Sequence, residues 1–253
     1  MLAGVLLAAI PAIPIVAGLI IGSASVRAET VGGNTYLPVT PTPPAPTPHS
    51  SKQPRQSGSL VALLKRPTTM LTRPGGPRLV TIATRTKFGS PQALWVVRQS
   101  GGLLGVISSD AGNGRVGWIG RSSTSLTRVT WELKVSLGDR RLTVLHNGKT
   151  IKHYAVAVGR PSAPTPTGHF SVTDRLETGD PGGPYGCCIL ALSARAPHAI
   201  QGWSGGDRIA IHSTPETSSI GQPVSHGCLR LTLAEGRWLM NHIPLGTPTL
   251  IRT

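Results

Sequence analysis

Two histidines, a cysteine and an arginine lie close together in the last third of the sequence. Thirteen residues separate His212 from His226, and Gly227, Cys228 and Arg230 follow directly on the second histidine. The chain contains only three cysteines. Side chains of these types can bind a metal ion, form a disulfide, or supply a thiol nucleophile together with its base.

A zinc site would use His212, His226 and Cys228 as ligands, with Glu216 the one carboxylate nearby in sequence. Three such ligands can form an open metal site. Zinc ligands usually come in short pairs, such as two cysteines two residues apart, and this order of residues follows no such pattern. The spacing therefore disfavours a zinc site.

A disulfide is the second interpretation. The other two cysteines, Cys187 and Cys188, are adjacent, and bridging neighbouring residues strains the disulfide geometry. Cys188 lies in a β-rich run, where a cysteine can serve as a small buried apolar residue. A Cys187–Cys228 bridge stays open as an alternative, and it would abolish any thiol chemistry at Cys228.

A thiol nucleophile is the third interpretation. A free cysteine needs a base or a positive field to ionise near neutral pH. Gly227 removes a side chain where a substrate carbonyl must approach Cys228. The backbone N–H groups of these two residues would then be free to stabilise an oxyanion. The sequence itself does not choose between His212 and His226 as the base.

Residues 129–253 supply the elements that must hold these side chains. Asn147-Gly148 between two β-rich runs predicts a hairpin, because both residues tolerate positive φ. Thr232 and Glu235 form a capping-box pattern, which predicts a helix that Pro244 ends after Ile243. Cys228 would lie just before this helix. The predicted strands cover residues 141–146, 150–158, 170–173, 188–192, 208–212 and 248–251.

Residues 60–125 read as a second, smaller β domain. Short β-rich runs at residues 79–82, 94–97, 103–107 and 116–119 are separated by Gly- and Pro-rich turns. The pattern resembles a bacterial SH3-like module, with Gly117-Trp118-Ile119 as its closing strand. It contains no catalytic group of residues, so either a wall-contacting or a scaffolding role fits. We therefore predict a mainly β fold, with a small SH3-like module before a β-sandwich or barrel that carries one marked helix.

The N-terminal part differs from both domains. Residues 1–22 carry no charge and are nearly all apolar, and Val26-x-Ala28 fits the small-residue rule for signal peptidase. We interpret residues 1–28 as a signal peptide or, if uncleaved, as a membrane anchor through residues 1–22. Residues 29–59 contain a Pro/Thr-rich tract and read as a disordered linker. The remaining chain is thus expected to be exported to the cell envelope, in the periplasm or the cell wall.

Composition and charge restrict the partners. The chain has 253 residues, is 39% hydrophobic and carries a formal net charge of +15, which fits a soluble globular body and no multi-span membrane protein. Residues 1–128 hold 13 Lys and Arg against 2 Asp and Glu, whereas residues 129–253 hold 12 against 8. A basic surface can bind nucleic acid. An exported protein rarely meets nucleic acid, so anionic wall polymers or lipid headgroups are the expected partners.

Taken together, residues 129–253 resemble the L,D-transpeptidase family with its YkuD-type catalytic domain. The family signature is a histidine, a spacer, then Ser/Thr-His-Gly-Cys, a hydrophobic residue, and Asn or Arg. Further matching segments occur in the family's order at Asn147-Gly148, Gly159, residues 164–170, residues 184–186 and residues 246–248. This sequence departs from the pattern at Cys187-Cys188, which the family lacks, and Arg230 stands where some members have Asn.

The resemblance implies roles for individual residues. Cys228 would be the nucleophile and His212 its general base, oriented by the backbone carbonyl of Ser213. His226 would line the site beside Gly227, and Arg230 would contact the donor or hold the loop. The residues implied to bind substrate are Tyr185, Gly186, Ser225 and Arg230, of which Tyr185 can equally be a structural corner.

The implied reaction is cross-linking of peptidoglycan. A thioester forms on the cysteine from a stem peptide, and an amine of a neighbouring stem then accepts the acyl group to give a 3–3 cross-link. With water as acceptor, the enzyme would be an L,D-carboxypeptidase. The implied chemistry needs no metal and no organic cofactor. Carbapenems are the expected inhibitors. Two alternatives are a catalytically idle wall-binding protein and a sortase, although sortases place their cysteine in a different sequence context.

Overall fold

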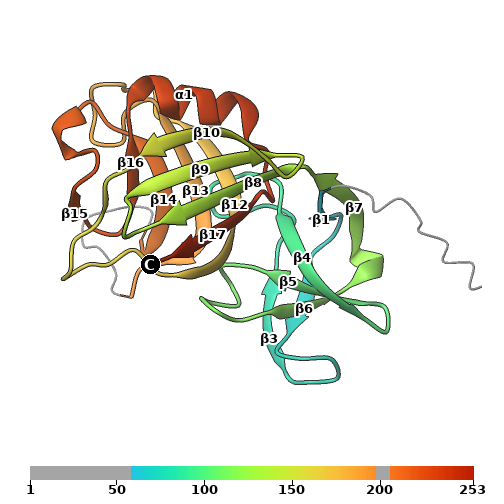
Figure 1. The fold of residues 1–253 in the computed structure, drawn as a ribbon. Coiled ribbons are helices and arrows are strands. Elements are labelled where there is room, and N and C mark those ends of the chain that lie inside the picture. Colours follow the sequence, from blue (N-terminus) through green and yellow to red (C-terminus); the bar gives the residue numbers. More distant parts are fainter. Residues whose placement is uncertain (1–57, 198–205) are drawn as a thin grey trace, which may run out of the picture. The chain divides into compact units, whose positions relative to one another are not determined.

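The computed structural model describes residues 58–197 and 206–253 (Figure 1). Within this part, the chain is built almost wholly of β-strands and has a single α-helix, so the prediction of a mainly β fold with one marked helix is confirmed. No helix among these residues is long and apolar enough to span a membrane. The predicted signal peptide or anchor, at residues 1–28, and nearly all of the predicted linker lie outside the described residues.

The first sheet contains seven antiparallel strands in the order β3-β2-β6-β5-β4-β1-β7. Its core is formed by buried residues such as Met70, Leu94, Leu104 and Ile119. The strand β7 runs past the predicted domain end at residue 125 and pairs with β1 along its whole length, from Ser59–Val129 to Leu64–Thr124. The likeness to an SH3-like module stays a prediction. The strands are β1 (Ser59–Leu64), β2 (Thr68–Leu71), β3 (Arg78–Ile82), β4 (Ala93–Ser100), β5 (Leu103–Ile107), β6 (Gly117–Gly120) and β7 (Thr124–Val129), with the short 3₁₀ helix η1 (Arg121–Ser123) before β7.

The second sheet contains eight strands in the order β10-β9-β8-β17-β12-β13-β14-β16. Two of its pairings are parallel, β17 with β8 and β14 with β16, and the others are antiparallel. A separate parallel pair joins β11 and β15. The elements are β8 (Trp131–Ser136), β9 (Arg141–His146), β10 (Lys149–Ala155), β11 (Val158–Gly159), β12 (Gly168–Glu177), β13 (Cys188–Arg195), β14 (Arg208–Ser213), η2 (Thr217–Ser219), β15 (Pro223–Ser225), β16 (Leu229–Leu231), α1 (Leu233–His242) and β17 (Pro248–Arg252).

Two local predictions in this sheet are confirmed. The hairpin between β9 and β10 turns at Asn147 and Gly148, whose φ angles are 51° and 75°. The helix α1 begins after the N-cap Thr232, whose side chain accepts a hydrogen bond from the Glu235 N–H, while the Glu235 carboxylate accepts one from the Thr232 N–H. The helix ends at its C-cap Ile243, directly before Pro244.

The helix packs closely on the strands that carry the candidate site. It contacts β13 and β14, and Figure 1 shows it lying along one side of this sheet. The close approach needs Gly236, because a Cβ atom there would lie 2.7 Å from the Cβ of Ser213. The last residue of β14 is therefore enclosed by the helix and has no exposed surface.

Candidate active site

Strand pairing brings the candidate nucleophile and its candidate base together. Cys228 precedes β16, which runs parallel to β14 with Ile211 opposite Leu229 and His212 opposite Arg230. Because neighbouring strands lie about 4.8 Å apart, the thirteen residues between the two histidines form a loop that returns beside its own starting strand. The thirteen-residue spacing between His212 and His226 thus reflects the length of the connection between the neighbouring parallel strands β14 and β16.

A cavity of about 210 Å³ lies at this point of the sheet. Six of the residues predicted from the sequence line it, together with Pro184: Tyr185, His212, Ser225, His226, Cys228 and Arg230. Three predicted residues, Ser213, Gly186 and Gly227, do not line the cavity but lie next to residues that do. The structure therefore gathers all nine predicted site residues in one region, six of them at the cavity surface.

His212 is held in one orientation from two sides. Its Nδ1 atom lies 2.8 Å from the backbone oxygen of Ser213. A carbonyl oxygen can only accept a hydrogen bond, so Nδ1 carries the proton and Nε2 keeps a free lone pair. The ring of Tyr185 packs edge-on against the imidazole, with 4.9 Å between the ring centroids. His226, by contrast, is exposed.

Burial sets the ionisation of the pair. His212 is only 3% exposed, and this burial lowers the pKa of its imidazole to about 4, with the Ser213 hydrogen bond raising it and the charge of Arg230 lowering it further. Burial also raises the pKa of the Cys228 thiol, although the backbone N–H of Ala210 and the charge of Arg230 act in the opposite direction. Near neutral pH the resting site therefore holds a thiol and a neutral imidazole.

The loop that carries Cys228 is fixed by backbone hydrogen bonds. Gly227 has a φ of 114°, a region that favours glycine, and a Cβ atom there would lie 2.8 Å from Ile209 Cδ1. Ser225 Oγ accepts from the Gly227 N–H at 3.1 Å and donates to the Cys228 carbonyl at 2.6 Å. The expectation that the Gly227 N–H is free for an oxyanion is thus wrong, because the Ser225 side chain already uses it.

Thr165 braces the same loop and was missed in the sequence. Its buried hydroxyl donates to the Gly227 carbonyl at 2.8 Å and accepts from the Gly159 N–H at 2.9 Å. The two carbonyls around the nucleophile, of Gly227 and Cys228, therefore both accept hydrogen bonds from side-chain hydroxyls. The signal was present in the Thr-Pro-x-Gly segment at residues 165–168, but only the fold shows that this segment reaches Gly227.

Comparison with known proteins agrees with this geometry. Residues 130–251 match the family model of YkuD, the L,D-transpeptidase catalytic domain. This segment belongs to the YkuD family. The match begins one residue before β8 and ends within β17, so the YkuD domain corresponds to the eight-stranded sheet with its helix.

Relatives in sequence carry the same domain. The protein YkuD of Bacillus subtilis strain 168 is 33% identical over 123 residues, which are 49% of this chain and 66% of that protein. L,D-transpeptidase 1 of Mycobacterium tuberculosis is 30% identical over 124 residues, 45% of this chain and 47% of the relative. The chain thus spans slightly less than two thirds of the first relative and about half of the second.

A solved L,D-transpeptidase from Mycobacterium smegmatis aligns in structure with a TM-score of 0.39 and 18% identity, covering 64% of this chain and 90% of that one. The family assignment rests on the sequence matches.

Arg230 lies on β16 within the YkuD domain, and its backbone forms a bridge with Ala157. The Nη1 atom of its guanidinium lies 3.4 Å from Glu216 Oε2, and the Glu216 side chain is largely exposed. The Nε atom is buried and has no hydrogen-bond partner among the described residues. Because Arg230 also lines the cavity, its guanidinium brings a positive charge close to Cys228.

The cysteines of the YkuD domain are paired differently from the sequence expectation. Cys187 and Cys188 form a disulfide, and Cys228 is a free, buried cysteine. The argument against bridging neighbours is therefore wrong here, and the open Cys187–Cys228 alternative is excluded in this structure. The physical reason is that Cys187 lies just before β13. Successive side chains within a strand point to opposite faces, but Cys187 lies outside the strand, so its side chain can point to the same side as that of Cys188. Among the described residues, no group of three or more His, Cys, Asp or Glu side chains is placed to hold a metal ion.

Proposed function

We propose that this chain is a peptidoglycan L,D-transpeptidase that works through a thioester on Cys228. The observation that carries the proposal is the fixed tautomer of His212: its Nδ1–H is bound to the Ser213 carbonyl, while Cys228 lines the same cavity as a free thiol. This arrangement leaves Nε2 as the proton acceptor that a buried thiol needs. The YkuD family match of residues 130–251 supports the same reaction.

The acylation step follows from the neutral resting pair. The Cys228 sulfur attacks the carbonyl carbon between the third and fourth residues of a stem tetrapeptide, and its proton passes to His212 Nε2. The tetrahedral intermediate then collapses, and the C–N bond breaks. The departing D-alanine amine takes the proton from His212, which leaves a thioester on the sulfur and a neutral imidazole. Within the protein, only Cys228 and His212 change their protonation state, and His212 has regained its neutral form at the end of the step.

The developing oxyanion needs hydrogen-bond donors close to the sulfur. The Gly227 N–H is occupied by Ser225 Oγ. For the Cys228 N–H, no acceptor is present within the described part of the chain. We therefore assign the Cys228 N–H as the backbone donor to the oxyanion, held in place because Thr165 and Ser225 fix the carbonyls on either side.

Arg230 and Tyr185 fit the recognition of the donor peptide. The guanidinium of Arg230, which lines the cavity, suits an acceptor oxygen such as a carboxylate or carbonyl of the stem, and its charge favours the thiolate that forms during attack. Tyr185 lines the cavity and also buttresses His212, so it combines the substrate-wall and structural roles that the sequence left open.

The thioester then has two fates. An amine from the side chain of a neighbouring stem gives a 3–3 cross-link, and water gives an L,D-carboxypeptidase. We propose the cross-link as the main product. The proposal includes export to the cell envelope by residues 1–28 and contact of the basic first half of the chain with anionic wall polymers. Carbapenems, which carry a reactive acyl group, are proposed to acylate the same sulfur.

The deciding experiment is intact-protein mass spectrometry after incubation with a stem tetrapeptide or a carbapenem. We expect an adduct with the mass of the acyl group, located on Cys228 by peptide mapping. Cys228→Ala serves as the matched control and should give no adduct while its circular dichroism spectrum stays unchanged. An unmodified wild-type protein would support the idle wall-binding alternative, and an adduct on the Cys228→Ala variant would refute the assignment of the nucleophile.

A further inference from the structure

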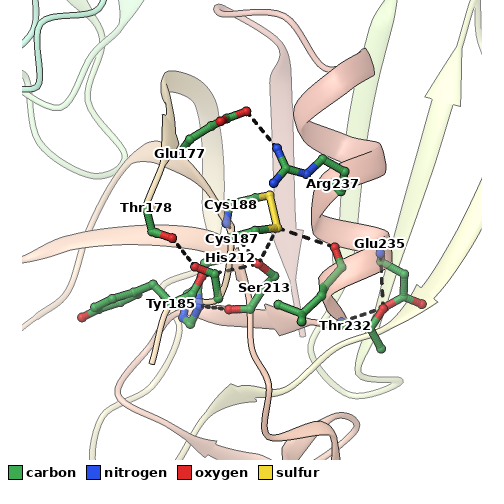
Figure 2. Close-up of a disulfide and its surroundings, with 12 residues drawn as sticks. Glu177, Thr178, Tyr185, Cys187, Cys188, His212, Ser213, Thr232, Glu235 and Arg237 are labelled. Atoms are coloured by element: carbon green, nitrogen blue, oxygen red, sulfur yellow. Dashed lines mark hydrogen bonds and ion pairs between the residues drawn. A yellow bond between two sulfur atoms is a disulfide. The ribbon is translucent and has the colours of Figure 1, made fainter. Parts of the chain in front are cut away.

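The disulfide between Cys187 and Cys188 lies directly behind the candidate base. Cys187 ends the turn that contains Tyr185 and Gly186, and Cys188 is the first residue of β13. Both cysteines are buried, with exposed fractions of 6% and 0%. Figure 2 shows the two sulfur atoms close to Ser213, with His212 on the far side of that residue. The proposed reaction gives this disulfide no role.

Ser213 connects the disulfide to the base through its two oxygen atoms. The hydroxyl Oγ lies 3.4 Å from Cys187 Sγ and accepts a hydrogen bond from the Cys188 N–H at 3.1 Å. The backbone oxygen of the same residue accepts the bond from His212 Nδ1. The backbone pairing between β13 and β14 ends at the pair Ile189–His212. Beyond it, the Ser213 hydroxyl, and not a backbone carbonyl, accepts the hydrogen bond from the Cys188 N–H.

The other side of the disulfide is anchored to β12. Cys188 pairs with Glu177, the Thr178 N–H donates to the Cys187 carbonyl at 3.1 Å, and the Thr178 hydroxyl donates to the Gly186 carbonyl. Figure 2 shows this set of contacts running from Thr178 to Ser213. A bridge between neighbouring residues closes a small ring that contains their peptide bond. The anchored ring therefore limits the movement of the segment that touches Ser213.

Ser213 has little room to adapt if this segment moves. A Cβ atom on Gly186 would lie 2.5 Å from Ser213 Oγ, and one on Gly236 would lie 2.7 Å from Ser213 Cβ. The turn before the disulfide and the helix thus enclose the residue from two directions. The same turn carries Tyr185, whose ring rests against His212. A movement at the disulfide would therefore disturb both contacts that orient the imidazole of His212, one from the Ser213 carbonyl and one from the Tyr185 ring.

We propose that the Cys187–Cys188 disulfide is a positioning element for His212, and that its reduction to two thiols weakens the alignment of this base with Cys228. The inference rests on the role of His212 in the proposed function. Reduction by a dithiol consumes two thiols of the reagent, which becomes a disulfide, and adds one hydrogen to each cysteine sulfur. The backbone of residues 187–188 then regains rotational freedom.

Reduction also changes the hydrogen bonds around Ser213. A disulfide sulfur carries no proton, so the contact of Cys187 Sγ with the Leu233 carbonyl, at 3.7 Å, becomes a hydrogen bond only after reduction. The new thiol proton draws Cys187 towards the start of α1 and away from its present contact with Ser213 Oγ. The oxidised form is thus the one in which Ser213, and with it the carbonyl that holds His212, is fixed.

The test measures the alkylation of Cys228 by iodoacetamide as a function of pH. Peptide mass spectrometry follows Cys228 alone, on the full chain as purified and after treatment with dithiothreitol that is removed without air. We expect one alkylatable thiol per chain before reduction and three afterwards. In the reduced protein the pH profile of the alkylation rate of Cys228 should move upwards, because a displaced His212 takes up the thiol proton less readily during the attack.

Two variants separate positioning from general loss of structure. In Cys187→Ala/Cys188→Ala, the profile should match reduced wild-type protein, and dithiothreitol should have no further effect. In Ser213→Ala, which keeps the backbone carbonyl but lacks the hydroxyl, reduction should shift the profile much less than in wild-type protein. If the double variant does not fold, the comparison of oxidised and reduced wild-type protein decides the result.

The proposal is overturned if oxidised and reduced wild-type protein give the same profile, or if the purified protein already has three free thiols. Because alkylation needs no peptidoglycan substrate, these outcomes are independent of transpeptidase activity. A protein that forms no adduct with the stem peptide, yet whose alkylation profile responds to reduction, would refute the proposed function and leave this inference standing.

Discussion

The backbone oxygen of Ser213 lies 2.8 Å from Nδ1 of His212, the residue directly before it in the chain. The proposed base is therefore oriented by a peptide carbonyl and not by the carboxylate that fills this place in a Ser-His-Asp triad. A carbonyl fixes the tautomer but adds no negative charge, and the imidazole consequently keeps a low pKa in its buried position. Such a base is neutral and ready to accept a proton over the whole physiological pH range.

Substitution of His212 and of His226 by alanine should slow the acylation of Cys228 to different extents. We expect His212→Ala to slow acylation of Cys228 by about 10²–10⁴, the usual contribution of a general base, and to move the alkylation profile of the thiol upwards. His226→Ala should lower turnover less, because His226 lies exposed at the cavity and is not held in a fixed orientation as His212 is. Acylation rates with a carbapenem measure both. A larger loss in His226→Ala would reverse the assignment of the base.

The low pKa of His212 should appear in the stability of the protein. The unfolded chain binds a proton at this histidine below about pH 6.5, whereas the folded protein does so only below about 4. Stability contributed by the neutral imidazole is therefore complete above pH 6.5 and lost as the pH falls towards 4, by about 3 kcal/mol. Denaturant unfolding at about pH 7 and pH 4.5 should show a smaller loss in His212→Gln than in wild-type protein. His226→Gln is the control, and equal losses in all three proteins would contradict the assignment.

The charge of Arg230 should act on both partners of the catalytic pair. It lowers the pKa of the Cys228 thiol and that of the His212 imidazole. Arg230→Gln should thus raise both, which slows alkylation of Cys228 at neutral pH and moves the NMR titration of His212 upwards. Arg230→Lys keeps the charge and should stay close to wild-type protein in both measurements, although it lacks the Nε donor. An unchanged alkylation profile in Arg230→Gln would show that the charge is screened.

The Thr165 hydroxyl should be needed for the shape of the catalytic loop. Thr165→Val keeps the volume but leaves the Gly227 carbonyl without its donor and the Gly159 N–H without its acceptor. Each buried group that loses its partner costs about 1–3 kcal/mol, so we expect lower stability together with slower acylation. Thr165→Ser retains the hydroxyl and should recover most of both. Wild-type acylation rates in Thr165→Val would show that the loop keeps its conformation without this bond.

Features that depend on local chemistry could be predicted from the sequence. The hairpin at Asn147-Gly148 and the helix that begins after Thr232 follow from residues that lie next to each other in the chain. The strand β8 was missed although Leu133 and Val135 alternate with polar neighbours, so its signal was present. By contrast, β15 and β16 contain three residues each and exist because of their partners β11 and β14. Strands of that length leave no periodic pattern.

Some features of the candidate site could likewise be predicted from local sequence, whereas others depend on tertiary contacts. The types and order of His212, Cys228 and their neighbours pointed to thiol chemistry, and the family resemblance chose the base. The use of the Gly227 N–H by Ser225 and the reach of Thr165 across the fold depend on tertiary contacts. The Cys187–Cys188 disulfide also depends on tertiary contacts. The general rule against bridging neighbouring cysteines does not consider the strands β12 and β14, whose residues contact this segment.

The position of β17 in the second sheet bears on how the protein is made. This strand lies between β8 and β12 and, among the residues that the structure describes, is the strand whose pairing joins the group β10-β9-β8 to the group β12-β13-β14-β16. Its partner Leu133 is more than a hundred residues away from Thr249 in the chain, which gives the pairing a high contact order and slows folding. While β17 is still inside the ribosome, the two groups of strands cannot join. The sheet that carries His212 and Cys228 is therefore completed only after β17 has left the ribosome, when both of these residues have long been synthesised.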